Sequence, residues 1–549
     1  MNPSIRRRLR PWTAALAATT AALIGITLTP SSSTAETSTR AKPDRVVIIL
    51  VDALSREIVN KYDMTNAKAL MGEGVNAKNA YLGHVGSVTV VTHNVLTTGL
   101  LPKRMGWVSE GYRDNGALAS FSSNPYWFTS DWTMDQMFAV QRAQGNPKLA
   151  DYLHAKRPGS KVITVSPKAY AAWGFGGPGS DSIITFSGRN YDCDGDGVNN
   201  WRGPTGVNVP TYLSEPACGR WYVDSAKTKT YDTNLDPAWL YPLDGDRYTI
   251  GDTTDHQGGD VWAADAAIAA MDNEDWSGIF VSLPGVDKAA HMWGSVDDTG
   301  TGLSHLREAA GVADAQIAKI VGHLRDTGQL DNTVVVLTAD HGSVPGEHFH
   351  GVNDGTTDRG FYNWYYGEGA NGTYLKPQPA LQPLVDTGNL AQAYSDSQLT
   401  FWLKDNSSAK VSEAVGIVAQ MPDVSAVWVR QGSRYVLSSP VRWDRMPTKG
   451  ERAWFKAHAQ ELVNTAAGPT GPDVLATLID DTTYSVAGDH GGIQRRTQQI
   501  PIVFAGAGLG PTDIGAGVRS VDIMPTVLKL LGIRPTAPLD GKAYDLPHH

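Results

Sequence analysis

Cysteine is scarce in this 549-residue chain, basic residues are outnumbered by acidic ones, and no internal repeat is evident. The chain has 47 Lys and Arg against 56 Asp and Glu, which gives a formal net charge of −9. Tight binding to a nucleic-acid backbone depends on clustered Lys and Arg that displace counterions. We therefore expect no binding to nucleic-acid duplexes, and small or locally steered substrates fit the charge better.

Apolar runs long enough to span a membrane are also lacking after the first 35 residues. The N-terminus has a basic segment with Arg6, Arg7, Arg8 and Arg10, an apolar run from 12 to about 28, and small residues up to Ala35. This layout predicts an export signal over 1–35 with cleavage near Ala35, followed by a linker over 36–42. A membrane anchor is the alternative, and it is disfavoured because the apolar run is short.

Export can follow the Sec route or, because of the adjacent arginines, the twin-arginine route, although the usual flanking residues of the latter are missing. Cleavage removes four arginines and no acid, so the formal net charge falls from −9 to −13. In an exported protein the separation of Cys193 and Cys218 favours one disulfide that closes a local loop. Two free buried thiols are the alternative.

Continuous apolar runs rich in β-branched residues predict strands that are buried on both faces. Polar residues follow three of these runs. Between the second and third runs, apolar residues recur at helical spacing and Gly328 ends the predicted helix, which together indicate the strand–helix–strand unit of a parallel sheet. Near the end of the chain, Asp522 is expected to cap a helix that Gly532 ends. The pattern predicts an α/β sandwich with a mostly parallel central sheet. The runs cover residues 46–51, 278–283, 334–338 and 502–505.

Two regions interrupt this pattern. Residues 188–246 are rich in Gly, Pro, Asp, Asn and aromatic residues and predict an ordered loop insertion. Residues 352–484 predict a small α+β cap, with a helix over 411–421 and strands over 425–429 and 434–437. We expect residues 43–351 and 485–549 to form the catalytic domain.

Acidic and imidazole side chains cluster in sequence where the predicted strands end. An Asp and a His four apart on a helix share one face, and such a pair alone is unremarkable. Three carboxylates at strand ends together with three histidines and a hydroxyl are harder to explain as independent surface residues. Zinc takes imidazole and carboxylate ligands, and six ligands divide into two sites of three. The six are Asp52, Asp287, His291, Asp340, His341 and His490.

The ordered set resembles the alkaline phosphatase superfamily and, within it, the type I phosphodiesterase and nucleotide pyrophosphatase branch. Residues 46–52 are similar to its opening strand and first ligand, and Thr89 to His93 followed by 98–102 is similar to its nucleophile helix. The resemblance covers most of the chain after the signal. It implies an alkaline phosphatase-like fold with two zinc ions.

The resemblance also implies the role of each residue. Asp287, His291 and His490 would hold one ion, and Asp52, Asp340 and His341 the other. Thr89 would lie between them, touch the metal and attack the phosphoryl group to give a phosphothreonine. A helix that begins at Thr89 would direct its N–H groups toward the phosphoryl oxygens. Ser87 is a nearby competitor for the role of nucleophile.

Several positions depart from the family. Val91 and Thr92 stand where the family often has Pro and Asn. An Asn that commonly donates to the phosphoryl oxygen falls at Glu110, or is displaced to Asn115. A carboxylate facing a phosphate is repulsive unless it is protonated or metal-bound.

Lys168 resembles a phosphate-binding lysine of some monoesterases, which carry an arginine two positions later where this chain has Tyr170. We expect Glu110, Lys168 and Tyr170 to contact substrate. An ordinary solvated lysine is the alternative for Lys168.

A calcium loop is the other candidate metal site. Asp192, Asp194 and Asp196 alternate before Gly197, as hard oxygen ligands do in such loops. Gly203 falls where the twelfth-position acid is expected, so a plain acidic turn is the alternative. His348 and His350 follow His341 closely, and they either contact substrate or are ordinary loop histidines.

These features predict a secreted, metal-dependent hydrolase of small phosphate esters, acting on phosphodiesters, nucleotide pyrophosphates or phosphomonoesters. Phosphonate or sulfate ester hydrolysis on the same scaffold is one alternative. No Cys or Ser followed by Pro-x-Arg accompanies the site, which weighs against a sulfatase. A non-catalytic binding protein that retains the metals is another alternative. The oligomeric state is not predicted.

Overall fold

The structure is a computed structural model that describes residues 42–186, 191–193, 195–199, 201–214, 221–224, 258–293, 295–296, 300–350, 365–368, 374–375, 379–486, 488–515 and 517–547. The predicted signal over 1–35, Cys218 and Asp194 lie outside these ranges, so the signal, the Cys193–Cys218 disulfide and the complete calcium loop stay predictions. Among the described helices, none combines the length and the apolar character needed to cross a membrane.

Nine strands form the main sheet of the described chain, in the order β22-β2-β21-β11-β1-β10-β5-β6-β8. Its centre is parallel, because β11, β1, β10, β5 and β6 all pair in one direction. β21 runs antiparallel to β11, and β8 runs antiparallel to β6 at the edge. The predicted mostly parallel α/β sheet is therefore confirmed. The strands are β1 (Arg45–Val51), β2 (Val75–Ala77), β5 (Lys161–Val165), β6 (Ser182–Phe186), β8 (Pro204–Val207), β10 (Trp276–Leu283), β11 (Thr333–Thr338), β21 (Ile502–Gly506) and β22 (Thr512–Ile514).

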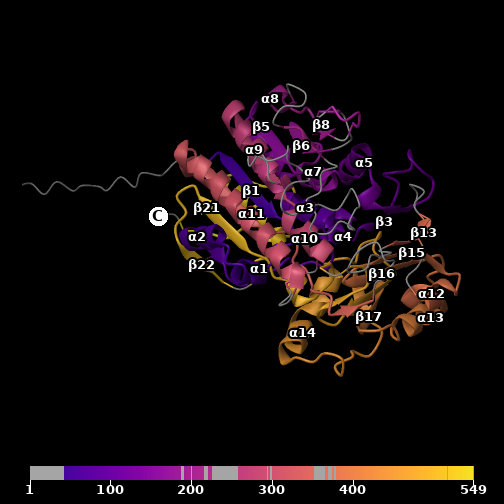
Figure 1. Ribbon diagram of the computed structural model, residues 1–549. Helices are drawn as coiled ribbons and strands as arrows, with labels where there is room; N and C mark the ends of the chain where they lie inside the picture. The colour runs from indigo at the N-terminus through magenta and orange to yellow at the C-terminus, as the bar shows by residue number, and fades with distance from the viewer. Residues whose placement is uncertain are drawn as a thin grey trace, which may run out of the picture. The chain divides into compact units, whose positions relative to one another are not determined.

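The apolar runs form the core of this sheet. Val46 to Val51 of β1 are fully buried, which requires cover on both faces of the strand. Helices supply that cover, and α9 and α11 lie side by side in front of the sheet in Figure 1. Side chains of these helices join the strands in one hydrophobic cluster. The helices of this cluster include α2 (Thr65–Glu73), α6 (Leu149–Lys156), α9 (Gly258–Asn273), α11 (Gly300–Asp326) and α16 (Ile523–Leu531).

The C-terminal helix α16 differs in one respect from the prediction. It ends at Gly532, which adopts the left-handed conformation with φ +73°, as expected. Asp522 precedes the helix, but its side chain does not cap it. One of its carboxylate oxygens accepts from Arg519 N and the other from Lys542 N. The backbone N–H of Lys542, near the end of the chain, thus takes the place of the N–H groups of α16 that Asp522 was expected to bind.

A second sheet of seven strands lies within residues 365–478, in the order β14-β13-β15-β16-β19-β17-β18. It has a hydrophobic core of its own, to which α13 (Ser408–Val418) contributes. The predicted helix over 411–421 and both predicted strands are present with small shifts of their ends. We call this sheet and its helices α12, α13 and α14 the cap. Its elements are β13 (Tyr365–Glu368), β14 (Tyr374–Leu375), α12 (Gln382–Val385), β15 (Leu390–Ser395), β16 (Gln398–Leu403), β17 (Val424–Gln431), β18 (Arg434–Leu437), α14 (Lys449–Asn464) and β19 (Val474–Leu478).

Short elements fill the remaining segments. Within the predicted insertion over 188–246, β8 extends the main sheet, while residues 225–246 lie outside the described ranges. The segments next to the strand ends carry the site described below. These elements are α1 (Arg56–Lys61), α3 (Thr89–Thr98), α4 (Pro102–Met105), β3 (Gly111–Arg113), β4 (Tyr126–Phe128), α5 (Met134–Gln144), α7 (Ala169–Gly176), β7 (Trp201–Arg202), α8 (Thr211–Ser214), β9 (Val223–Asp224), α10 (Gly285–Trp293), β12 (His348–Phe349), β20 (Thr482–Thr483) and α15 (Arg495–Gln498).

Candidate active site

Polar side chains from four neighbouring strands meet at one edge of the main sheet. Asp52 directly follows β1, Asp340 follows β11, and Asp287 lies on α10 just beyond β10. Lys168 precedes α7 just beyond β5. Since these strands are parallel and adjacent, their carboxyl ends share one edge, which is where ligands bind in open α/β sheets.

The first group of candidate ligands is Asp287, His291 and His490, whose ligand atoms lie within 4.8 Å of one another. Asp287 Oδ1 is 3.2 Å from His291 Nε2 and 3.6 Å from His490 Nε2. Asp287 and His291 are one turn apart on α10, so the helix places both on one face. His490 comes from the loop before α15.

The second group is Asp52, Asp340 and His341, again with ligand atoms within 4.8 Å of one another. His341 Nε2 is 3.3 Å from Asp52 Oδ1 and 3.5 Å from Asp340 Oδ2. All three side chains are fully buried. The two groups adjoin, because the rings of His341 and His490 stack with centroids 3.5 Å apart.

Hydrogen bonds fix the orientation of two of the imidazole rings. His341 Nδ1 lies 3.1 Å from Gly342 O, and His490 Nδ1 lies 3.1 Å from Ser87 O. An Nδ1–H that donates to a carbonyl leaves Nε2 with a lone pair for a metal ion. Burial lowers the pKa of His341 to about 3 and, together with His341 itself, lowers that of His490 well below its usual range. Both rings are therefore neutral at physiological pH.

The acidic side chains have oxygens that no protein donor satisfies. Asp52 Oδ1, Asp287 Oδ1 and Asp340 Oδ2 are buried and accept no hydrogen bond from the described residues. These same oxygens face the histidine Nε2 atoms. Buried acceptors without donors are expensive unless a cation compensates them. Two sets of one or two carboxylates with one or two imidazoles thus fit two divalent ions.

The ammonium group of Lys168 lies between the two groups. Its Nζ is 2.7 Å from Asp52 Oδ2, 2.9 Å from Asp287 Oδ2 and 2.9 Å from Thr89 Oγ1. Burial alone would lower the pKa of Lys168, but Asp287 and Asp52 outweigh it and raise this pKa well above 10.5. For Asp287, burial alone would raise the pKa, but the positive charge of Lys168 outweighs burial and lowers this pKa well below its usual range. Lys168 is a buried charge of the site, not a solvated surface lysine.

Thr89 begins helix α3, as the sequence predicts. Its Oγ1 is 3.4 Å from His341 Nε2, and no side chain caps the N-terminus of the helix. The first N–H groups of a helix have no partner within it, so they are available to an anion at this end. Ser87, the competing hydroxyl, is buried and donates to Gly492 O at 3.2 Å, which turns it toward the backbone.

His93 is a member of the site whose role the sequence did not reveal. Its ring nitrogens lie 2.6 Å from Thr89 O and 3.0 Å from Ser282 Oγ, and Nδ1 is also 3.5 Å from Asp340 Oδ2. The ring packs edge-on against Phe175. His93 therefore holds the first turn of α3 against β10 and the Asp340 carboxylate. The sequence feature that points to this role is the position of His93 four residues after Thr89, one turn along the helix.

Glu110 is buried next to this centre and binds the cap. Its Oε2 accepts from Tyr394 Oη of β15 at 3.3 Å. Burial raises its pKa to about 7 although the charge of Lys168 opposes the shift. Asn115, the alternative position, is exposed. Tyr170 places its ring 5.3 Å from Lys168 Nζ.

Asp260 of α9 supports the metal-facing helix from behind. Its Oδ1 accepts from Gly285 N at 2.9 Å, the first residue of α10. A carboxylate at a helix N-terminus stabilises it through the hydrogen bond and the helix dipole. Asp260 thereby positions the helix that carries Asp287 and His291, and no local pattern in the sequence indicated this contact.

The other sequence candidates lie apart from this centre. Asp192 accepts from Gly195 N and Gly197 N, and Asp196 accepts from Val198 N, as in a hydrogen-bonded turn. His350 Nε2 lies 2.7 Å from Asp423 Oδ2, and His348 is 3.9 Å from the same oxygen. These histidines thus contact the cap.

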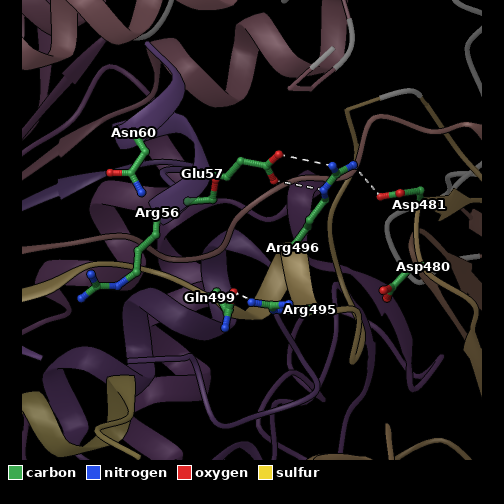
Figure 2. Close-up of a pocket in the computed structure, with 9 residues that line it drawn as sticks. Arg56, Glu57, Asn60, Asp480, Asp481, Arg495, Arg496 and Gln499 are labelled. Atoms are coloured by element: carbon green, nitrogen blue, oxygen red, sulfur yellow. Dashed lines mark hydrogen bonds and ion pairs between the residues drawn. The ribbon is translucent and has the colours of Figure 1, made fainter. Parts of the chain in front are cut away.

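A cleft of about 460 Å³ opens among α1, α15 and the loop after β19. Figure 2 shows Arg496 held there between Glu57 and Asp481, with Arg56 and Arg495 nearby. None of the residues that line it belongs to the two candidate ligand groups. The cleft is therefore a mixed-charge surface feature and not the centre described above.

Comparison with known sequences identifies a family. The sequence profile of the type I phosphodiesterase / nucleotide pyrophosphatase family matches residues 46–492. The chain is 23% identical over 538 residues to the alkaline phosphatase PhoK of Sphingomonas sp., covering 92% of this chain and 91% of that one. It is 24% identical to the alkaline phosphatase PhoD of Zymomonas mobilis, covering 91% and 88%.

Solved structures share the fold. The alkaline phosphatase PafA superposes with a TM-score of 0.58 at 17% identity, covering 91% of this chain and 98% of that one. A solved mutant of PafA has a threonine, an asparagine, a lysine and an arginine substituted. Murine ectonucleotide pyrophosphatase / phosphodiesterase 5, solved with AMP, superposes with a TM-score of 0.52 at 10% identity, covering 91% and 97%.

Proposed function

Because the chain belongs to the type I phosphodiesterase / nucleotide pyrophosphatase family, and is thus a metal-dependent hydrolase of phosphoric esters, we propose that Thr89 is its nucleophile. The observation that carries the proposal is the position of Thr89 Oγ1, 3.4 Å from His341 Nε2 of one ligand group and 2.9 Å from Lys168 Nζ, which also contacts Asp287 of the other. Asp287, His291 and His490 would hold one zinc ion, and Asp52, Asp340 and His341 the other, with Thr89 as a shared contact.

The reaction would proceed in two displacements. Two bound divalent ions supply positive charge that favours the ionised Thr89 hydroxyl and the developing charge on the leaving oxygen. Thr89 Oγ1 forms a bond to phosphorus while the bond to the leaving alcohol breaks, which gives a phosphothreonine. Water then attacks phosphorus, restores the Thr89 hydroxyl and releases the phosphate product. The uncapped N–H groups at the start of α3 point at the phosphoryl oxygens throughout.

Lys168, Glu110 and Tyr170 would contact the substrate. Lys168 serves as a point charge for a phosphoryl oxygen once the ions occupy its present acidic partners. The PafA mutant has, in chain order, a threonine, an asparagine, a lysine and an arginine substituted. Thr89 and Lys168 match its threonine and lysine in residue type. Glu110 and Tyr170 stand in the same order as its asparagine and arginine but differ from them in type. Glu110 in its neutral form donates to a phosphoryl oxygen, and Tyr394 of the cap orients it.

The proposal also covers the metal, the export of the protein, the second candidate metal site and the substrate class. Zinc suits the imidazole and carboxylate ligands best. The N-terminal segment supports secretion after cleavage near Ala35, and export would allow the Cys193–Cys218 disulfide. The turn at Asp192, Asp194 and Asp196 would take calcium. The substrate would be a small phosphodiester, nucleotide pyrophosphate or phosphomonoester.

The test is turnover of bis-p-nitrophenyl phosphate and p-nitrophenyl phosphate by the purified protein with its metal content assayed. We expect zinc-dependent release of p-nitrophenol from at least one ester, and the preferred ester assigns the subclass. Thr89→Ala should abolish turnover, because it removes the attacking oxygen, while both ions remain bound. Thr89→Ser keeps a hydroxyl and should retain part of the activity.

Ser87→Ala is the matched control, since it removes the competing hydroxyl and should leave turnover largely intact. Loss of activity in Ser87→Ala with retention in Thr89→Ala would reverse the assignment. A wild-type protein with two ions per chain that cleaves neither ester would contradict the phosphate-ester substrates. Phosphonate cleavage or a binding role would then be the better account.

A further inference from the structure

A lysine outside the two ligand groups is buried without an acidic partner for its ammonium. Lys148, the residue before α6, is 4% exposed. Its Nζ donates to Asn94 Oδ1 of α3 at 2.9 Å and to Gly174 O of α7 at 2.8 Å. Within the described part of the chain, this ammonium forms no ion pair with a carboxylate. Lysine is almost never buried unless it is paired, because burying its charge is costly, so this position needs an explanation.

The surrounding chain leaves room for this lysine. Gly177 follows α7 with φ +71°, and a Cβ on it would come within 2.5 Å of Lys148 Cδ. Gly174 lets α7 approach α3 closely, since a Cβ there would lie 3.3 Å from Asn94 Nδ2. Gln141 Nε2 of α5 donates to the same Asn94 Oδ1 at 2.9 Å. The lysine stem and its two acceptors therefore occupy a closely packed, defined place.

Each acceptor belongs to a helix that carries a residue of the site. α3 begins at Thr89, and Asn94 Nδ2 donates to Val90 O in the first turn of that helix at 2.9 Å. α7 directly follows Lys168. The two helices lie side by side (Figure 1). Lys148 thus connects the helix of Thr89 to the helix of Lys168, and Thr89 Oγ1 lies 2.9 Å from Lys168 Nζ.

The ammonium lies near the C-terminal end of α7. Carbonyl groups at this end of a helix have no partner within it and carry the negative end of the helix dipole. Burial lowers the pKa of Lys148 to about 7, and the charge of Asp151 opposes this shift. The ammonium and the neutral amine both have enough N–H groups for the two acceptors. The contact therefore persists in both protonation states.

We propose that Lys148 is a positioning residue, which joins α3 to α7 and thereby fixes Thr89 relative to Lys168. The inference rests on the proposed role of Thr89 as nucleophile. Lys148 lies outside both ligand groups, so it acts through the two helices. Without its ammonium, Gly174 O loses this donor, and α3 can shift against α7. A displacement of about 1 Å between reacting groups can cost about 100-fold in rate.

Steady-state hydrolysis of the preferred p-nitrophenyl ester by zinc-loaded wild type and Lys148→Met measures the effect. Methionine fills the space of the lysine stem but cannot donate. We expect kcat to fall about 10- to 100-fold with a much smaller change in KM, because the ions and Lys168 remain to bind the ester.

Lys156→Met is the matched control, because Lys156 ends the same helix α6 and also binds a helix-terminal carbonyl. Its Nζ donates to Leu531 O at the end of α16 and to Pro43 O just before β1, each at 2.5 Å. The segment before β1 lies at the edge of the sheet opposite the site. Lys156→Met should therefore keep the wild-type kcat.

A second comparison separates positioning from general packing. In a Lys168→Ala background, the loss caused by Lys148→Met should shrink to less than about threefold, because no Lys168 is left to be misplaced. A general packing defect would lower kcat by the same factor in both backgrounds. Asn94→Ala removes the acceptor on α3 instead of the donor and should lower kcat as Lys148→Met does. This variant keeps the test open if Lys148→Met does not fold.

Wild-type kcat in Lys148→Met, an equal loss in Lys156→Met, or an equal loss with and without Lys168 would overturn the proposal. Failure of the proposed function is visible separately, as a wild type that cleaves neither ester or a Thr89→Ala protein that stays active. A crystal structure of Lys148→Met then decides the present inference by itself. A shift of α3 against α7 supports it, and an unchanged distance from Thr89 Oγ1 to Lys168 Nζ overturns it.

Discussion

At the scale of single residues, Glu110 is the side chain that most distinguishes this site. It is a buried acid beside Lys168, and burial raises its pKa from 4.5 to about 7. Below pH 7 it is neutral and can donate to a phosphoryl oxygen, and above pH 7 its charge repels one. We predict that KM for a phosphate ester rises as the pH passes through 7, and that Glu110→Gln removes this rise. Steady-state kinetics from pH 6 to 9 provide the measurement, and parallel pH profiles for both proteins would contradict the assignment.

The same shift predicts a stability effect. The native state keeps the Glu110 proton up to pH about 7, whereas the unfolded chain releases it near pH 4.5. The native state is thus penalised as the pH rises through this window, by up to about 3 kcal/mol. Glu110→Gln should therefore gain stability relative to wild type at pH 8 but not at pH 4. Denaturant unfolding at both pH values measures the difference.

His93 acts through Thr89, so its replacement should separate catalysis from binding. Its contacts with Thr89 O and Ser282 Oγ hold the first turn of α3. We predict that His93→Phe lowers kcat about 10- to 100-fold, the usual range for a residue that orients a metal site, with a much smaller change in KM. The partly buried His458 packs on Trp454 away from the site, and His458→Phe is the control. Equal losses in both variants would mean a general packing effect.

At the scale of elements, helix α10 carries Asp287 and His291, and Asp260 holds its N-terminus. Asp260→Ala should cost about 1 to 2 kcal/mol of unfolding free energy, because it removes a cap. It should also weaken binding at the site that contains these two ligands. Asp272→Ala removes another acid from the same helix α9, where the side chain is 51% exposed, and should leave zinc affinity unchanged. Zinc competition with a chromophoric chelator distinguishes the two variants.

Helices and strands that are determined by a short sequence pattern could be predicted from the sequence. β1, β10 and β11 appear as largely apolar runs, and the acids that follow them meet because parallel strands end at one edge. The start of α3 at Thr89 and the end of α16 at Gly532 also follow local rules. The antiparallel direction of β21 does not, since direction depends on how the chain returns to the sheet.

Contacts between distant segments could not be predicted. Tyr394 and Glu110 are 284 positions apart, and only the fold of the cap brings them together. The failure of Asp522 to cap α16 has the same origin, because Lys542 competes for its carboxylate. The hydrogen bond from Ser397 N to His490 O likewise forms only once β15 and β16 pack against the loop that carries His490.

At the scale of the whole molecule, the metal-facing residues and the cap meet at one place. The segments that follow strands of the main sheet supply Asp52, Asp287 and Asp340, while the cap reaches the site through Tyr394 and Ser397. A shared scaffold with variable surroundings is how one fold serves several substrates. We therefore expect changes at Tyr394 to alter the choice of ester more than the chemistry of the reaction.

The central claim is that two metal ions and Thr89 together hydrolyse a phosphate ester, and zinc titration of the chelated protein tests it most directly. Protein stripped of metal should be inactive toward both p-nitrophenyl esters. Turnover of the preferred ester should return on titration and saturate at two zinc ions per chain, while Thr89→Ala binds the same two ions and stays inactive. Turnover that survives chelation, or that persists in Thr89→Ala, would contradict the account.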